Sequence, residues 1–341
     1  MNAINGYLEK TKNILYTGKL EKLSSPIEVY IEMTNQCNLN CIYCYKKNRN
    51  ISENIIFDKR YLTNILEPLH ISSPGPVLFV LEGGEPFLHQ DIIDIIQIIK
   101  KYGHSIDILT NGECFNENII KKLSEVIDVE SDEIQISLDG ITENSLKNRN
   151  NNPEKIIDNI RKLNLFKIIP RINIVVTKNN INDIPGLLDF IDEKVSVSAV
   201  SINAVMGKNN KMLQASIEAR EKLCEDIRTN SYSFTVMLSV MHNICDELSC
   251  DLNVAEKSDY YRRCTALTGK VCISANGDVY PCVFYEGKIP AIGSVKNRSL
   301  MEIWKSQEAA TFRQNRIIQL ERCVTCNNNR NCTQICAGSA L

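Results

Sequence analysis

The sequence EVYIEMTNQCNLNCIYC, residues 28–44, carries an apolar strand pattern that leads directly into three closely spaced cysteines. Glu28–Thr34 is rich in Val, Tyr, Ile and Thr, which predicts a β-strand. The thiols of Cys37, Cys41 and Cys44 follow it in the spacing C-x3-C-x2-C. Binding sites of parallel βα sheets and barrels lie beyond the carboxyl ends of the strands, so this loop is a candidate site.

Short β-rich runs alternate with helical patterns from residue 28 to about 205. This alternation predicts consecutive βα units around a parallel sheet, and therefore an α/β fold. The further strands that we predict are Val77–Leu81, Ser105–Thr110, Glu133–Leu138, Arg171–Thr177 and Val197–Ala204. Helices are predicted over Asp91–Tyr102, which has Asp at its start and Gly just past its end, and over Pro153–Leu165, which has Pro in its first turn.

The composition excludes several classes of partner. The 341 residues are 43% hydrophobic and 23% charged, with a formal net charge of −2, so no excess of basic charge would attract nucleic acid or anionic lipid. Residues 1–20 lack a signal-peptide core, and no run of about 18 apolar residues could span a membrane. We therefore expect a cytoplasmic protein that binds neither nucleic acid nor membrane.

The chain has 14 cysteines, of which nine follow residue 244 and only Cys114 and Cys224 stand apart from any group. A reducing cytosol keeps thiols free, so metal ligation or redox chemistry is expected in place of structural disulfides. Three thiolates on the loop at 37–44 can each bind one iron of a four-iron cluster, which leaves one iron open. A zinc site is the alternative, although structural zinc needs four ligands.

Further motifs follow the later strands. Gly83-Gly84-Glu85-Pro86 comes after the second strand, Asn111 after the third and Ser137 at the end of the fourth. Arg149 lies farther along in a polar run, where a solvated loop arginine is the alternative to a ligand-binding one. The glycines would allow the backbone to approach a ligand, because they have no Cβ.

Together with the aromatic Tyr43 before the third cysteine, these motifs resemble those of the radical S-adenosylmethionine (radical SAM) superfamily over residues 28 to about 205. The resemblance implies a partial (β/α)6 TIM-like barrel and a [4Fe–4S] cluster on the three cysteines, whose open iron binds S-adenosylmethionine. A low-potential donor such as ferredoxin or flavodoxin would reduce the cluster and release a 5′-deoxyadenosyl radical. The resemblance also implies roles for the other residues. Gly83, Gly84, Glu85 and Pro86 would bind the methionine amino group. Tyr43 would contact the adenine, Asn111 would line the cofactor, Ser137 would contact the ribose and Arg149 would contact the carboxylate.

The C-terminal cysteines resemble a SPASM domain, the extension found on radical SAM enzymes that act on peptides and proteins. By this resemblance the first auxiliary [4Fe–4S] cluster is held by Cys264, Cys272, Cys282 and Cys336, and the second by Cys323, Cys326 and Cys332. No cysteine follows Cys336, so the fourth ligand of the second cluster is not assigned. It could be Cys245, Cys250 or a residue other than cysteine. Alternatively, the fourth iron could bind substrate, or the second cluster could be absent. Zinc is again the alternative.

The expected domains are an N-terminal extension over 1–27, a radical SAM barrel over 28–235 and an auxiliary cluster domain over 236–341, held together by metal more than by a large core. The 27 residues before the first strand are too few for a leader-recognition domain, so a separate leader-peptide recognition protein, or direct binding of the leader, is expected.

The resemblance favours a maturase of a ribosomally made peptide, for example one that forms thioether or carbon–carbon crosslinks. An anaerobic sulfatase maturase is the first alternative, but its relatives carry an acid directly after the cysteine matching Cys282, where this chain has Val283; Glu286 nearby could take that place. A small-molecule substrate such as a porphyrin is the second. A non-catalytic electron carrier is disfavoured, since it needs no site for methionine.

Overall fold

The computed structural model describes residues 22–46, 53–206, 208–240 and 265–319. A ten-stranded sheet runs through them in the order β10-β9-β8-β1-β2-β3-β4-β5-β6-β7. Neighbours from β8 to β7 are parallel, whereas β9 and β10 are antiparallel. The strands are β1 (Glu28–Glu32), β2 (Leu78–Glu82), β3 (Ser105–Thr110), β4 (Glu133–Ser137), β5 (Arg171–Val176), β6 (Ala199–Ala204), β7 (Thr235–Ser239), β8 (Lys270–Ile273), β9 (Asp278–Tyr280) and β10 (Gly293–Ser294).

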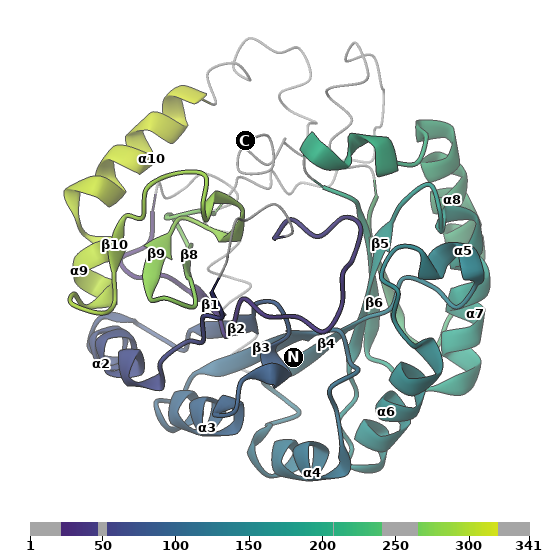
Figure 1. The fold of residues 1–341 in the computed structure, drawn as a ribbon, viewed down its shortest axis with the longest axis horizontal. Helices are drawn as coiled ribbons and strands as arrows, with labels where there is room; N and C mark the ends of the chain where they lie inside the picture. Colours follow the sequence, from purple (N-terminus) through teal and green to yellow (C-terminus); the bar gives the residue numbers. More distant parts are fainter. Residues whose placement is uncertain (1–21, 47–52, 207, 241–264, 320–341) are drawn as a thin grey trace.

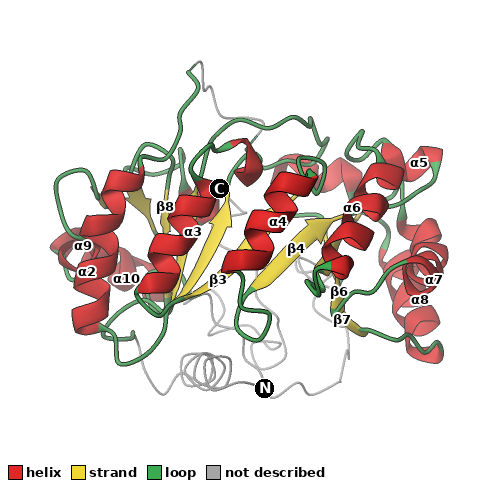
Figure 2. Cartoon of the chain, turned by 90° about the horizontal axis from the view of Figure 1, so that it is seen from below, coloured by secondary structure: helices red, strands yellow, loops and turns green. Residues whose placement is uncertain are grey.

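The α-helices lie along the outer side of the curved sheet, as Figures 1 and 2 show. With the short 3-10 helices labelled η, the helices are η1 (Lys59–Tyr61), α2 (Leu62–Ser72), η2 (Pro86–Leu88), α3 (Ile92–Lys101), α4 (Glu117–Val126), α5 (Glu143–Leu146), α6 (Pro153–Leu165), η3 (Ile181–Asp183), α7 (Ile184–Lys194), η4 (Lys208–Leu213), α8 (Ile217–Thr229), η6 (Val283–Tyr285), α9 (Leu300–Trp304) and α10 (Gln307–Gln319). Within the described residues, no helix has the length and apolar character needed to cross a membrane.

Local sequence explains these elements. The isoleucines of α3 that are buried, Ile92, Ile95, Ile96 and Ile99, recur at helical spacing and form one face toward the sheet. Helix α6 begins where Asn152 accepts a hydrogen bond from the backbone N–H of Lys155 at 3.1 Å. Along β5, buried and half-buried residues alternate, so the apolar side chains pack under the helices and the alternate ones line the concave inner face.

The six predicted strands are present, and the parallel α/β arrangement is confirmed. Four strands, β7, β8, β9 and β10, were not predicted. Helix α8 is followed by β7, and β7 pairs with β6. The strand β8 pairs in parallel with β1. The division into three domains stays a prediction, although β7 extends the sheet beyond residue 235.

The described part of the C-terminal region shares the core of the barrel, an arrangement that our expectation of a region held together by metal did not include. Leu300, Ile303 and Trp304 are at most 1% exposed and belong to the same apolar cluster as the strands and helices of the barrel. The indole N–H of Trp304 donates to the carbonyl oxygen of Leu23 at 3.2 Å. Pairing of β8 with β1 brings residues 265–319 against the barrel, as the position of α9 beside α2 in Figure 1 shows.

Candidate functional site

The cysteine triplet lies on the loop that follows β1. Cys37 is exposed, whereas Cys41 and Cys44 are half-buried, and all three are free thiols. Burial raises the pKa of Cys41 to about 11; the neighbouring thiols Cys44 and Cys37 add to the rise, and Arg149 opposes it. Burial also raises the pKa of Cys37. The three thiols are thus close enough to affect one another's charge, and bound iron would stabilise their thiolate forms.

Two glycines bring the end of β2 against this loop. The backbone N–H of Gly84 donates to the carbonyl oxygen of Thr34 at 2.7 Å. A Cβ on Gly83 would lie 2.5 Å from the Thr34 oxygen, and one on Gly84 would lie 1.8 Å from the carbonyl oxygen of Gln36. Both distances are sterically forbidden. The structure therefore gives these glycines a second purpose besides ligand approach, which is close packing of two backbones.

The carboxylate of Glu85 connects the ends of β2 and β3. Its Oε1 accepts a hydrogen bond from Thr110 Oγ1 at 2.6 Å, and its Oε2 accepts one from the backbone N–H of Asn111 at 2.8 Å. The residue is fully buried, and burial raises the pKa of Glu85. Since its carboxylate oxygens already accept hydrogen bonds from protein donors, the side chain fixes the positions of Thr110 and Asn111.

Asn111 in turn reaches into the cysteine loop. Its Nδ2 donates to Asn38 Oδ1 at 2.8 Å, and Asn38 Nδ2 donates to Glu113 Oε2 at 3.2 Å. Asn111 also lies close enough to the thiol of Cys37 to lower its pKa, against the larger effect of burial. Asn38 and Glu113 were missed from the sequence; the position of Asn38 between the first two cysteines was the available signal.

On the opposite side, a buried ion pair holds the loop. The hydroxyl of Tyr43 and Nε of Arg149 both donate to Asp139 Oδ2, the latter at 2.9 Å. The Nη1 of Arg149 lies 4.0 Å from the sulfur of Cys41. Arg149 is only 9% exposed, so it is not a solvated loop arginine. Asp139, to which our sequence reasoning gave no individual role, lies two residues beyond Ser137 and the end of β4.

Ser137 is half-buried at the end of β4, and among the described residues its hydroxyl has no hydrogen-bond partner. It is therefore available to a ligand. Pro86 is buried in the first turn of η2, where it sets the direction in which the chain leaves β2. The predicted contact residues thus lie at the end of β4 or in the segments that follow β1 to β4, with Arg149 beyond α5.

The donors fit an iron–sulfur cluster. Thiolates are soft ligands suited to iron–sulfur clusters and to zinc. Within residues 22–46, 53–206, 208–240 and 265–319, no three His, Cys, Asp or Glu side chains converge closely enough to hold a single metal ion. The three nearby thiols of the loop can each bind one iron of a cluster with several irons.

Two of the C-terminal cysteines lie in the described residues. Cys272 is fully buried on β8, and Cys282, which follows β9, is 4% exposed and packs with Ala266. Burial raises the pKa of Cys272 well above its ordinary value. The other predicted auxiliary ligands and the two candidate extra cysteines lie outside the described residues: Cys264, Cys323, Cys326, Cys332, Cys336, Cys245 and Cys250.

A buried cluster of charged side chains lies near Cys272. Lys46 Nζ lies 2.6 Å from Glu32 Oε1 and 3.6 Å from Glu82 Oε1. The backbone N–H of Ala275 donates to Glu32 Oε2 at 3.1 Å. Glu82 and Glu32 are also among the charges that raise the pKa of Cys272. The charges that act on Cys272 therefore include the partners of Lys46, which lies two residues beyond Cys44.

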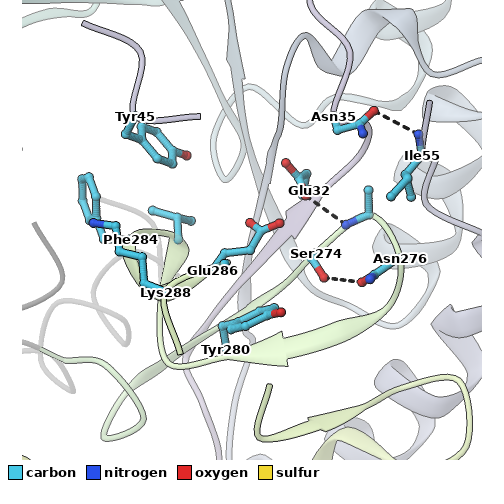
Figure 3. Close-up of a pocket in the computed structure, with 13 residues that line it drawn as sticks. Glu32, Asn35, Tyr45, Ile55, Ser274, Asn276, Tyr280, Phe284, Glu286 and Lys288 are labelled. Carbon is cyan, nitrogen blue, oxygen red and sulfur yellow. Dashed lines mark hydrogen bonds between the residues drawn. The ribbon is translucent and has the colours of Figure 1, made fainter. Parts of the chain in front are cut away.

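A cavity of about 490 Å³ opens between the cysteine loop and the segment that follows β9. Figure 3 shows its lining, to which Tyr45 contributes from the loop and Phe284 and Glu286 from beyond β9. The rings of Tyr45 and Phe284 are 5.1 Å apart. Val283 also lines the cavity. The space is large enough for an amino-acid side chain and mixes aromatic with charged groups.

Comparison with protein families identifies both regions. The radical SAM superfamily matches residues 31–191, and the iron–sulfur cluster-binding SPASM domain matches residues 264–327. Fe-coproporphyrin III synthase of Methanosarcina barkeri is 24% identical over 307 residues, which cover 84% of this chain and 75% of the relative. PqqA peptide cyclase of Methylorubrum extorquens is 23% identical over 317 residues, covering 90% and 79%.

Solved structures have the same fold. SuiB of Streptococcus suis bound to S-adenosylmethionine matches with a TM-score of 0.73 and 19% identity, over 97% of this chain and 77% of SuiB. SuiB bound to its precursor peptide SuiA matches with a TM-score of 0.69 and 18% identity, over 99% and 78%. At these identities the likeness establishes the fold.

Proposed function

The chain belongs to the radical SAM superfamily and carries an iron–sulfur cluster-binding SPASM domain, and from this premise we propose that it is an enzyme that oxidatively modifies a peptide or protein. The observation that supports this proposal best is the cavity lined jointly by the cysteine loop and the segment beyond β9. A substrate bound there would lie close to the loop of Cys37, Cys41 and Cys44 and to Cys272. The similarity to PqqA peptide cyclase and to SuiB bound to its precursor peptide also supports a peptide substrate.

The predicted site residues would have different roles. Cys37, Cys41 and Cys44 would hold the first cluster, which with S-adenosylmethionine supplies a 5′-deoxyadenosyl radical that removes a hydrogen atom from the substrate. The backbone of Gly83 and Gly84 would meet the methionine amino group. Glu85 would act by fixing the position of Asn111, since its own oxygens are occupied.

Three side chains would bind the rest of the cofactor. Ser137 offers a hydroxyl without a protein partner in the described residues to the ribose. Arg149 uses Nε for Asp139, which leaves its terminal nitrogens for a carboxylate, the ligand that a guanidinium prefers. The loop at Tyr43 would contact the adenine.

The overall reaction is an oxidation of the substrate. Loss of a hydrogen atom leaves a carbon radical; when this radical forms a new bond, a proton and one further electron leave the substrate. We propose that the auxiliary cluster of Cys264, Cys272, Cys282 and Cys336 accepts this electron. A ferredoxin or flavodoxin would supply electrons to the first cluster, a separate protein could present the leader peptide, and the enzyme would work in the cytoplasm.

Formylglycine formation is the second candidate, and one observation favours it. It requires a base near the auxiliary cluster, and Glu286 both lines the cavity and is among the charges that raise the pKa of Cys272. Val283 lines the same cavity but cannot accept a proton. Glu286 would then replace the acid that related maturases carry directly after the cysteine.

The test is formation of 5′-deoxyadenosine by the anaerobically reconstituted and reduced chain, beside a Cys37/Cys41/Cys44→Ala variant. We expect formation that is lost in the variant. Precursor peptides encoded beside the gene and a peptide with a sulfatase-type Cys or Ser site are then compared by mass spectrometry. A loss of two hydrogens from the first peptide supports the maturase, whereas formylglycine in the second supports the other candidate; no 5′-deoxyadenosine with any peptide contradicts both.

A further inference from the structure

We propose that Asp139 is a positioning residue that holds the guanidinium of Arg149 beside Cys41 and thereby raises the reduction potential of the first cluster. This inference rests on the proposed function in one respect, namely that Cys37, Cys41 and Cys44 hold a redox-active cluster. Neither the sequence motifs nor the implied cofactor contacts give Asp139 a role. The burial and the hydrogen bonds of Asp139 indicate this role.

The carboxylate of Asp139 is almost completely buried, at 2% exposure, and it receives donors from three separate segments. Its Oδ1 accepts from the backbone N–H of Val175 on β5 at 2.9 Å. Its Oδ2 accepts from Nε of Arg149 at 2.9 Å and from the hydroxyl of Tyr43 in the cysteine loop. Each of these donors needs an acceptor, and burial excludes water as a substitute.

The partner that matters for the cluster is Arg149. Its guanidinium carbon lies 5.5 Å from the centre of the Tyr43 ring, and its Nη1 lies 4.0 Å from the sulfur of Cys41. A reduced cluster carries one more negative charge than an oxidised one, so a nearby cation favours reduction. The effect is strong here because the guanidinium is buried, where charges are poorly screened.

Asparagine at position 139 cannot make the same contacts. If its oxygen accepts from Val175, its amide N–H2 faces the N–H of Arg149; if its oxygen accepts from Arg149, its N–H2 faces the N–H of Val175. Either orientation sets donor against donor in a buried place. Asp139→Asn is therefore expected to displace Arg149 from Cys41.

Tyr43 provides the control. Its carbonyl oxygen also accepts a hydrogen bond from Asn210 Nδ2 at 2.9 Å, so the loop keeps a second attachment when the hydroxyl is removed. Tyr43→Phe leaves the pair of Asp139 and Arg149 in place. This variant therefore distinguishes the effect of loosening the cysteine loop from the effect of moving the Arg149 charge.

The experiment measures the midpoint potential of the first cluster by redox titration followed by electron paramagnetic resonance. Samples are reconstituted full-length chains without S-adenosylmethionine: wild type, Asp139→Asn, Arg149→Gln, the double variant and Tyr43→Phe, matched for iron content. We expect Asp139→Asn and Arg149→Gln to lower the potential by similar amounts, the double variant to lower it no further, and Tyr43→Phe to change it least.

The sign of the shift decides the outcome. If Asp139 acted only through its own negative charge, Asp139→Asn would raise the potential, and this result overturns the inference. Additive single effects overturn it as well. Should Asp139→Asn fail to fold, Arg149→Gln alone is sufficient, since an unchanged potential there removes the basis of the proposal. A wild-type chain that forms no reducible cluster at this loop would contradict the proposed function itself, which is a different failure.

Discussion

The two described cysteine regions are built in opposite ways. Cys37, Cys41 and Cys44 lie on an irregular loop, partly open to solvent and held by polar contacts from Asn111, Asp139 and Arg149. Cys272 lies inside a strand with no exposed surface. In the proposed function the triplet must admit a cofactor and a substrate, which agrees with an open loop whose geometry depends on hydrogen bonds. Cys272 would only have to hold a cluster, which a thiol within the sheet can do.

The largest expected effect separates the two regions by function. Cys41→Ala should abolish formation of 5′-deoxyadenosine, a loss of at least about 10³-fold, because the first cluster loses a ligand. Cys272→Ala should leave cleavage of S-adenosylmethionine within about threefold of wild type while product formation from the substrate is lost. Both are measured by chromatography of the reaction mixture, after iron analysis. Equal loss of cleavage in both variants would show that the two regions do not act separately.

The next effect concerns the core that the barrel and the C-terminal region share. Trp304→Ala should lower the free energy of unfolding by about 3–5 kcal/mol, because a fully buried indole is replaced by a cavity. Urea unfolding followed by circular dichroism should keep a single transition. Leu165→Ala, at a side chain that is 82% exposed, is the control and should change the free energy by less than about 0.5 kcal/mol. A separate early transition in Trp304→Ala would mean that the two parts unfold independently.

The smallest effect tests the packing beneath the open loop. Gly84→Ala should lower the free energy of unfolding by about 1–3 kcal/mol, because its Cβ would lie 1.8 Å from the Gln36 oxygen. It should also reduce the amount of iron bound at the first cluster. Gly186→Ala is the matched control. No atom lies within 4 Å of a Cβ at this position in α7, so the change should raise stability by up to about 1 kcal/mol. Thermal unfolding and iron analysis measure both; an unchanged iron content in Gly84→Ala would contradict the packing argument.

Much of the barrel could be predicted from sequence because its signals are local. The strand β3 and the helix α6 have the bounds that their composition and first-turn residues predict. The strand β7 was missed because its uninterrupted apolar run, residues 236–238, is short and follows a polar stretch. The pairing of β8 with β1 joins distant parts of the chain, and no local pattern reports it.

The site was predictable in its residues but not in its contacts. The spacing of the cysteines and the order of the motifs predicted where the site lies. That Glu85 has its carboxylate occupied by Thr110 and Asn111, and that Arg149 is paired with Asp139, follows from the positions of side chains on neighbouring strands. Such pairs depend on three-dimensional packing, which a motif does not encode.

The place of β8 beside β1 also bears on synthesis of the protein. Glu28 of β1 pairs with Lys270, so a ribosome must add some 240 residues before the first strand meets this neighbour. At typical elongation rates this takes roughly 12 to 48 s. Throughout that interval one edge of β1 has unpaired backbone groups, and an exposed edge can pair with the wrong strand. The nascent chain should therefore depend on chaperones during this period, and the cysteine loop would be complete before the strand that carries Cys272 exists.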